Sequence, residues 1–259
     1  MSGGFAFQVG ALARRSVLRT LRQPAMVIPS LFFPLLLLSI NAGGLDSATE
    51  LPGFPTDSYL QFALAIAFVQ GALFSANSAG TNVSNDVETG FLNRLALTPL
   101  RRLALLMGQL AGIMALGLLQ AVTFLVVGLV AGAGIEAGVT GAVVIVVLSL
   151  VISLAFGSIG AFVALRTGSG EAVQGIFPLL FAALFLSSMA LPRNLIETAW
   201  FREVATYNPV SYMLEAIRSL VIFGWDGEAL ALGFACAGGV ALIAILAASS
   251  ALRTRMVRT

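Results

Sequence analysis

Residues 103–135 read LALLMGQLAGIMALGLLQAVTFLVVGLVAGAGI, and no charged residue interrupts this run. At about 1.5 Å per residue, one helix of this length would measure roughly 45–50 Å. The hydrocarbon layer of a membrane is only roughly 30 Å thick, so such a helix must tilt or project beyond it. Soluble core helices rarely stay uncharged over this length. The stretch therefore predicts an integral membrane protein.

The rest of the chain has the same apolar character. Its 259 residues are 58% hydrophobic and only 10% charged, whereas about a quarter of the residues in a soluble domain carry charge. We expect an all-α integral membrane protein with six transmembrane helices. The predicted spans are residues 25–42, 59–79, 99–135, 139–165, 172–191 and 229–252. A cleavable signal peptide is the alternative interpretation of the first run, because a basic region precedes it.

Three segments outside these spans have patterns of their own. Residues 1–24 place apolar residues at helical spacing on one face and arginines on another, which predicts an N-terminal amphipathic interfacial helix on the cytoplasmic side. Residues 192–228 are too polar to span, yet they contain an apolar helical pattern that predicts re-entrant external helices between the fifth and sixth spans. Residues 253–259 are predicted to be a cytoplasmic tail.

Several kinds of chemistry are excluded by composition. The chain has no Lys and no His, so it can form neither a phosphate-binding P-loop nor a Ser/His/Asp triad nor a histidine-ligated metal site. Its single cysteine, Cys236, can form no internal disulfide and lies in an apolar run, which favours a packing role. We expect no catalytic residue, metal or cofactor in this chain.

The arginines predict the orientation. With six spans and the N-terminus inside, all but three of the 14 arginines fall on the cytoplasmic side, the exceptions being Arg193, Arg202 and Arg218. This distribution satisfies the positive-inside rule and predicts a multi-pass protein of the bacterial cytoplasmic (inner) membrane with both termini in the cytoplasm. The positive charge is explained by orientation, and no nucleic-acid partner is expected.

No predicted span has a charged residue near its middle, which disfavours an ion-coupled carrier. A path through the spans would instead be lined by aromatic and uncharged polar groups. The candidates are Phe32, Phe33, Gln70, Phe74, Asn77, Gln120, Phe177, Phe181, Phe185, Ser188 and Met189. Such a path favours an amphipathic drug-like molecule or a lipid over a sugar chain. Packing between helices or contact with lipid is the alternative role for each of these residues.

The segment between the second and third spans reads NDVETGFLNRL over residues 85–95. It mixes acidic residues, Arg94 and two apolar residues, Phe91 and Leu92, that are expected to be exposed. This mixture is typical of a short helix that inserts into a groove on a partner. A solvated loop with incidental charges is the alternative.

Two separated motifs resemble those of one transporter family. Glu88-Thr89-Gly90, Leu92, Arg94-Leu95 and Thr98-Pro99-Leu100-Arg101 resemble the motif after the second span of permeases in the type-2 ABC exporter family. Ser187 to Arg193, Asn208-Pro209-Val210 and Glu215-Ala216-Ile217-Arg218 resemble its signature after the fifth span. The resemblance covers essentially the whole chain, with Gln109 where the family usually has Lys. It is greatest to daunorubicin-resistance-type drug exporters.

The resemblance implies a permease subunit that exports its substrate from the cytoplasm or inner leaflet by alternating access. It would pair with a second permease copy, identical or related, and with two separate ABC ATPase subunits that hold ATP and Mg. Residues 1–24 would be a connecting helix, residues 85–95 a coupling helix and residues 192–228 the external re-entrant region. The implied coupling residues are Arg15, Arg19, Asp86, Glu88, Thr89, Gly90, Phe91, Leu92 and Arg94. The implied external gate comprises Pro192, Asn208, Pro209, Glu215 and Arg218.

Other functions stay open at this point. The family that the chain resembles also includes permeases for polysaccharides or other glycoconjugates, which is an alternative function. Membrane lipids are expected partners in either case. A non-transporting membrane assembly factor is a candidate from a different class, and an ion-coupled carrier is another.

The predicted orientation can be tested by labelling single cysteines in a variant whose Cys236 has been replaced. We expect a cysteine at Thr254 to be protected from an impermeant thiol reagent in intact cells, and one at Thr198 or Asp57 to react. Labelling in the opposite sense would overturn the orientation.

Overall fold

The computed structural model describes residues 4–96 and 102–257, which form helices and connecting turns without any strand. Within this part, five helices are long and apolar enough to cross a membrane. They are α2 (Pro24–Gly44), α3 (Tyr59–Glu88), α5 (Arg102–Val130), α6 (Gly138–Thr167) and α10 (Gly227–Val257). A further apolar helix, α7 (Gly170–Phe185), has 16 residues and is shorter than these.

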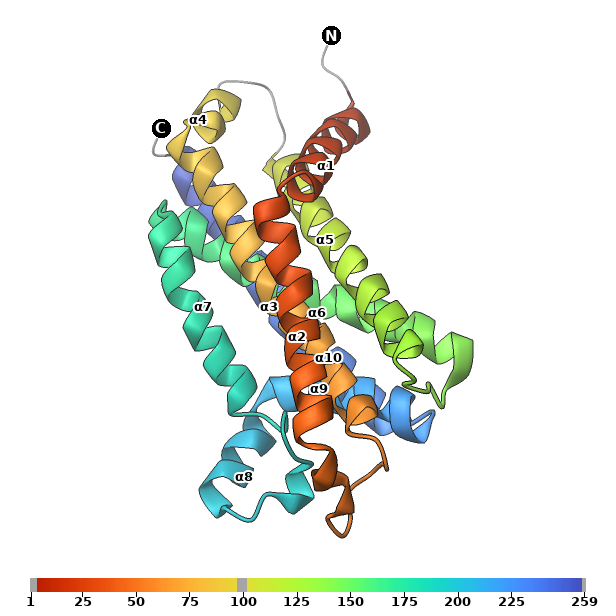
Figure 1. Ribbon diagram of the computed structural model, residues 1–259. Coiled ribbons are helices and arrows are strands. Elements are labelled where there is room, and N and C mark those ends of the chain that lie inside the picture. Colours follow the sequence, from red (N-terminus) through yellow and green to blue (C-terminus); the bar gives the residue numbers. More distant parts are fainter. Residues whose placement is uncertain (1–3, 97–101, 258–259) are drawn as a thin grey trace.

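Short helices lie at the two ends of the bundle. They are α1 (Phe5–Leu21), η1 (Asp46–Glu50), α4 (Phe91–Ala96), η2 (Arg193–Leu195), α8 (Ala199–Tyr207), α9 (Pro209–Arg218) and the π-helix η3 (Ser219–Phe223). The α1 helix, α4 and the last turns of α10 lie at one end, here called the α4 end, and α8 lies at the other, the α8 end (Figure 1). The first and last helices therefore have their outer termini on the same side.

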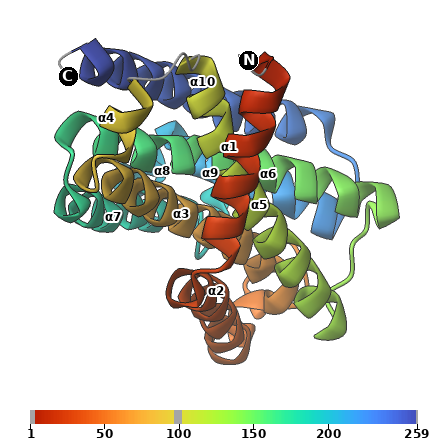
Figure 2. The ribbon, with the colours of Figure 1, turned by 90° about the horizontal axis from the view of Figure 1, so that it is seen from above.

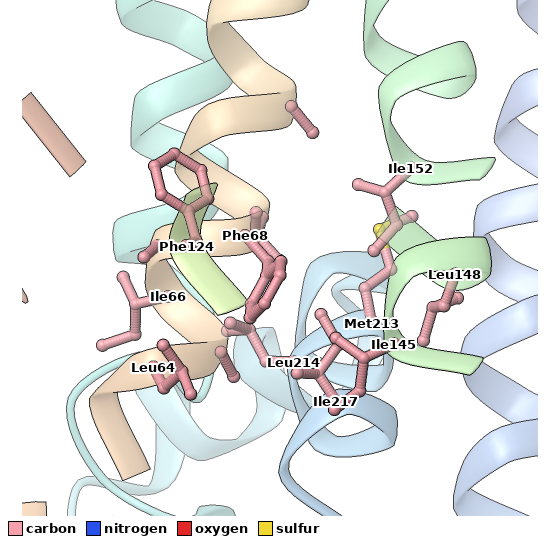
Figure 3. Close-up of a cluster of buried hydrophobic side chains, with 14 of the residues drawn as sticks. Leu64, Ile66, Phe68, Phe124, Ile145, Leu148, Ile152, Met213, Leu214 and Ile217 are labelled. Carbon is pink, nitrogen blue, oxygen red and sulfur yellow. The ribbon is translucent and has the colours of Figure 1, made fainter. Parts of the chain in front are cut away.

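Helix α3 forms the centre of the bundle and α2 its edge. Of the most apolar stretch of α3, 83% of the residues are buried, against 17% in α2, and a view along the bundle places α2 at the periphery (Figure 2). The core joins α3, α5, α6 and α9 through Leu64, Phe68, Phe124, Ile152 and Met213, among others (Figure 3). Helix α9 belongs to the segment of residues 192–228 that is too polar to be predicted as a span. It is nevertheless packed inside the bundle at the α8 end.

Three helix ends differ from the sequence predictions, each because of a local backbone feature. The third predicted span reaches residue 135, but α5 ends at Val130. Gly132 adopts φ +97° and the Ala133 N–H donates to the Gly128 carbonyl, which is the hydrogen-bonding pattern of a glycine-terminated helix. The predicted start of this span at Thr98 and Pro99 lies outside the described residues.

The predicted coupling helix over residues 85–95 is divided into two parts. Asp86 and Glu88 belong to the last turn of α3, which continues well beyond the predicted end of the second span at residue 79. Gly90 then adopts φ +68°, a conformation that glycine reaches without steric strain. The turn at Gly90 separates α3 from the short helix α4.

The fifth predicted span, residues 172–191, is also shorter in the structure, where α7 ends at Phe185. The following residues leave the helix although several are apolar. Side chains from α3 and α9 bind the polar backbone groups of this segment, as described below, so a helical continuation is not needed to satisfy them.

Close contact between α3 and α6 depends on Gly160. A Cβ atom at this position would collide with the backbone carbonyl of Ala76. We expect Gly160→Ala to destabilise the protein by roughly 1–3 kcal/mol, as overpacking does in other cores, because backbone cannot move aside as a side chain can. Gly175→Ala in α7 is the matched control, since no atom lies within 4 Å of its added methyl group. Thermal unfolding in detergent measures both, and equal midpoints for the two variants would contradict this account of the contact.

Candidate functional site

An arginine–carboxylate cluster joins α1 to α3 at the α4 end. Arg15 donates two hydrogen bonds to the Asp86 carboxylate at 2.8 and 3.2 Å, and Arg19 donates a third at 2.5 Å. The Asp86 side chain is only 10% exposed, so its charge is balanced by two cations at a site with limited access to water. Removing one partner from a buried ion pair destabilises a protein, because it leaves the other charge unpaired. The cluster therefore fixes the position of α1 against the end of α3.

Helix α4 is seated on the same cluster by its two apolar residues. The Phe91 ring lies under the Arg15 guanidinium, 3.8 Å from its carbon atom, and Leu92 is 3% exposed and packs with Val83 and Leu105. The expectation that Phe91 and Leu92 are exposed is therefore wrong for Leu92, which is buried, and for Phe91, which is partly covered by Arg15. Both side chains already have partners within the chain, and these attach α4 to the bundle.

In the turn at Gly90 and in the side chains of α4 that the structure describes, the exposed residues are polar. Glu88, Thr89 and Arg94 are exposed, and Arg94 donates to the Thr89 carbonyl at 3.3 Å across the turn at Gly90. Among the predicted coupling residues that the structure describes, these three and Arg15 are the exposed ones. A partner that approaches α4 would meet charged and hydroxyl groups first.

Helix α1 packs along α5 through two glycines. Cβ atoms at Gly108 and Gly112 would collide with Leu12 and Ser16 of α1, so the helices approach closely at both positions. A cavity of about 40 Å³ extends from Asp86 toward Ser75 between these helices and α3. This volume is enough for a water molecule, and the cavity wall includes polar atoms without a hydrogen-bond partner in the described part of the chain, on Asn82 and Gln109.

Five of the six predicted path phenylalanines form one cluster between α2, α3 and α7. Phe74 lies 5.3 Å from Phe177 and 5.8 Å from Phe33, measured between ring centroids. Phe181 is 5.0 Å from Phe177 and continues the cluster to Phe185 at 6.4 Å. Phe32 is not part of it in any described ring contact; its side chain is 63% exposed on α2.

The predicted amide residues divide between α3 and α5. Gln70 and Asn77 are one turn to either side of Phe74 and share its face by helical register. Their Oε1 and Oδ1 atoms are buried and have no hydrogen-bond partner among the described residues. Gln120 instead belongs to α5, and its Oε1 accepts a hydrogen bond from the Ser75 hydroxyl of α3 at 3.2 Å. The structure thus brings two unused acceptors next to the aromatic cluster and places the third amide elsewhere.

At the α8 end, the predicted gate residue Arg218 binds three carbonyl groups at once. Its guanidinium donates to the carbonyls of Ser188 at 2.5 Å, Met189 at 2.6 Å and Phe62 at 3.1 Å, and it lies over the Phe62 ring. Arg218 is only 4% exposed. Charge-assisted bonds to three carbonyls compensate the loss of water around this cation. Ser188 and Met189, predicted as path residues, therefore serve here as backbone partners of Arg218.

Glu215 connects Arg193 to the same segment. Its carboxylate accepts from Arg193 at 2.5 Å and from the Ser188 hydroxyl at 3.1 Å, and the Arg193 guanidinium lies 4.6 Å from the centre of the Tyr212 ring. Burial lowers the pKa of Arg193, but Glu215 and Tyr212 raise it by more, so this residue stays cationic.

The predicted gate residues Asn208, Pro209 and Pro192 occupy the turns around α9. Asn208 caps α9 by accepting from the Val210 N–H at 2.9 Å and donates to the Ala183 carbonyl at 2.6 Å. Pro209 is the first residue of the helix. An N–H at this position would have no partner within the helix, so proline costs no hydrogen bond there. Pro192 directly precedes η2. Asn208 thereby ties the start of α9 to the end of α7.

Two residues of this network were missed in the sequence. Tyr59 donates to the Ala190 carbonyl at 3.0 Å, and the Ser188 N–H donates to the Ser211 hydroxyl at 3.0 Å. Tyr59 stands at the predicted start of the second span, where an interfacial tyrosine is common, and Ser211 directly follows the quoted Asn208-Pro209-Val210. Neither position signals a partner far away in the sequence.

Comparison with known proteins gives a consistent result. The profile of the family described as ABC-2 type transporter matches residues 7–222. The chain is 28% identical over 213 residues to "Putative transport permease ycf38" of Porphyra purpurea, covering 82% of this chain and 72% of the relative. It is 27% identical over 218 residues to the protein of the same name from Cyanophora paradoxa, covering 83% and 74%.

The Arg218 network predicts that lysine cannot replace this arginine. An ammonium group lacks the planar fork that reaches three carbonyls in different directions, so Arg218→Lys should leave at least one of them unpaired and destabilise the protein by about 1–3 kcal/mol. Arg202→Lys is the matched control because Arg202 is exposed on α8. Thermal unfolding in detergent compares the two, and an unchanged midpoint for Arg218→Lys would refute the role given to the three bonds.

Proposed function

The chain belongs to the ABC-2 type transporter family, and from this premise we propose that it is the permease subunit of an ATP-driven exporter. The family is a transmembrane transport component rather than a catalytic protein, and its permeases normally work with an ATPase subunit. In this proposal two ABC ATPase subunits hold ATP and Mg and hydrolyse the nucleotide. The chain has no Lys for a phosphate-binding loop of its own.

The arrangement of the α4 end carries the proposal. Arg15 and Arg19 bind Asp86, and the Phe91 ring is held under Arg15, so α1, α3 and α4 form one connected unit. A rigid unit can pass a displacement into the bundle. In our proposal the exposed surface of Glu88, Thr89 and Arg94 contacts the ATPase, and its motion reaches the spans through α3.

The proposed cargo is an amphipathic drug-like molecule or a lipid that leaves the cytoplasm or the inner leaflet by alternating access. The phenylalanine cluster between α2, α3 and α7 supports an apolar path. The unused acceptors of Gln70 and Asn77 beside it could bind a donor group on the cargo. Sites for small molecules commonly combine apolar walls with a few polar groups.

The proposed complex contains two permease copies, identical or related, in the bacterial cytoplasmic membrane. Ile28, Phe32, Leu36 and Ile40 form an exposed apolar stripe at four-residue spacing along α2, which suits contact with lipid or with a second copy. We further propose that α7 and the turn after it make the sixth crossing. The α4 end, with the arginines of α1, would then lie in the cytoplasm and the α8 end outside, where Arg218, Glu215 and Asn208 would form the exit gate.

Charge reversal at the exposed α4 surface tests this proposal. Arg94→Glu would place a carboxylate where the partner is expected to meet a cation, and like-charge contact at an interface costs several kcal/mol. We expect at least about a tenfold weaker association with the ATPase subunit and a matching loss of export. The measurement is copurification of the ATPase with the tagged chain from native membranes, together with nucleotide-dependent efflux.

Arg202→Glu provides the matched control, because it makes the same charge change on an exposed residue of α8 at the opposite end. It should leave association unchanged. ATPase recovery with Arg94→Glu equal to wild type would remove α4 as the contact. ATP hydrolysis by the rigorously purified single chain would contradict the division of labour between the two subunits.

A further inference from the structure

A second, larger cavity lies at the α8 end, outside the aromatic cluster. Its volume is about 510 Å³, and it is bounded by the loop before α3, by η2 and by the segment from α9 to the start of α10. This volume is in the usual range for small-molecule sites, roughly 300–1,000 Å³. Phe62, Ile222 and Phe223 provide apolar walls. The cavity is therefore large enough for part of an amphipathic molecule.

The charged groups around the cavity are balanced but are not all paired with one another. Arg193 and Arg218 contribute two cations, and Glu215 and Asp226 two carboxylates. Arg193 pairs with Glu215, whereas Asp226 makes no ion pair among the described residues and accepts only from the N–H groups of Glu228 and Ala229. A wall with both signs of charge and no net charge fits a zwitterion better than a single anion or cation.

The acidic side of this wall extends into a neighbouring hollow. That hollow has a volume of about 200 Å³, shares Arg193, Glu215 and Asp226 with the cavity and adds Glu228. A cationic group would therefore be favoured near Asp226 and Glu228. An anionic group would be favoured in the main cavity, which is lined by Arg193 and by Asn194.

Exposed aromatic residues place the mouth of the cavity at a membrane surface. Phe223, which lines the cavity, is 67% exposed, and Trp225, between it and α10, is 59% exposed. Tryptophan is enriched where a membrane meets water, because its ring is apolar and its N–H is polar. Lipid headgroups lie at the level where a membrane meets water, so they are the candidate ligands of this cavity.

We propose that this cavity binds the headgroup of a phospholipid that carries a primary ammonium group, as phosphatidylethanolamine does. The phosphate lies toward Arg193 and Asn194, and the ammonium donates to Asp226. Only a primary ammonium can donate here, because the quaternary group of phosphatidylcholine has no N–H. Phosphatidylglycerol has no cation for the carboxylate. The site rests on the proposed function only for the assignment of the α8 end to the outer leaflet.

The test measures lipid binding by the purified full chain without any ATPase, so its result does not depend on coupling or export. The chain, freed of lipid in detergent, is mixed with equal amounts of phosphatidylethanolamine, phosphatidylcholine and phosphatidylglycerol, and bound lipid is read by native mass spectrometry. We expect about tenfold preference for phosphatidylethanolamine, the size of one charge-assisted hydrogen bond. Equal binding of the three lipids would overturn the proposal.

Asp226→Asn removes the negative charge while asparagine can still cap α10, so the fold should be kept. It should abolish the preference, whereas Asp57→Asn, the same change at an exposed acidic residue that does not line the cavity, should retain it. Ala229→Leu keeps the charges but fills part of the cavity, and it should lower occupancy by the favoured lipid. Unchanged preference in Asp226→Asn together with unchanged occupancy in Ala229→Leu would place the lipid elsewhere.

Discussion

A backbone group that leaves a helix in a buried part of the bundle needs a hydrogen-bond partner, because an unpaired buried carbonyl costs free energy. This constraint explains the α8 end. The chain turns out of α7 after Phe185, and the carbonyls of Ser188 and Met189 that become free are bound by the guanidinium of Arg218. Tyr59 binds the next carbonyl, that of Ala190. A buried cation and an irregular segment thus satisfy each other, and neither would be stable here alone.

Arginines also fix the α4 end, but they bind a different kind of group. Arg15 and Arg19 hold a carboxylate rather than carbonyls, and Asp86 is on the last turn of α3. Because Phe62 accepts from Arg218 near the start of the same helix, α3 is fixed at both ends by arginines. Its 30 residues span roughly 45 Å without an internal proline. Phe74, in the aromatic cluster, lies between these two attachments, so α3 connects all three regions described above.

Much of this arrangement could be predicted from the sequence, because membrane spans depend on composition over long windows. The runs that became α2, α3, α5, α6 and α10 were recognisable as spans. Their ends were harder to predict, since they depend on single backbone positions such as Gly90 and Gly132, both with positive φ. The inward position of Leu92 could not be foreseen either, because a short apolar pair looks the same whether it meets a partner protein or the bundle itself.

The contacts of Arg218 also bear on how the α8 end could move. Most hydrogen bonds of its neighbourhood stay within residues 183–218, including those from Arg193 and Ser188 to Glu215 and from Asn208 to Ala183. Among the residues that the structure describes, the bonds of Arg218 to Phe62 and of Tyr59 to Ala190 join this unit to α3. Two backbone bonds, to Leu220 and Val221, join the adjoining π-helix to the turn before α6. Pulling Arg218 away from Ser188 and Met189 would leave a charge and two carbonyls unpaired. Moving residues 183–218 as one body keeps those two bonds but breaks the bonds from Arg218 to Phe62 and from Tyr59 to Ala190, so the hydrogen bonds of Arg218 and Tyr59 hold this unit to α3 as well as holding it together.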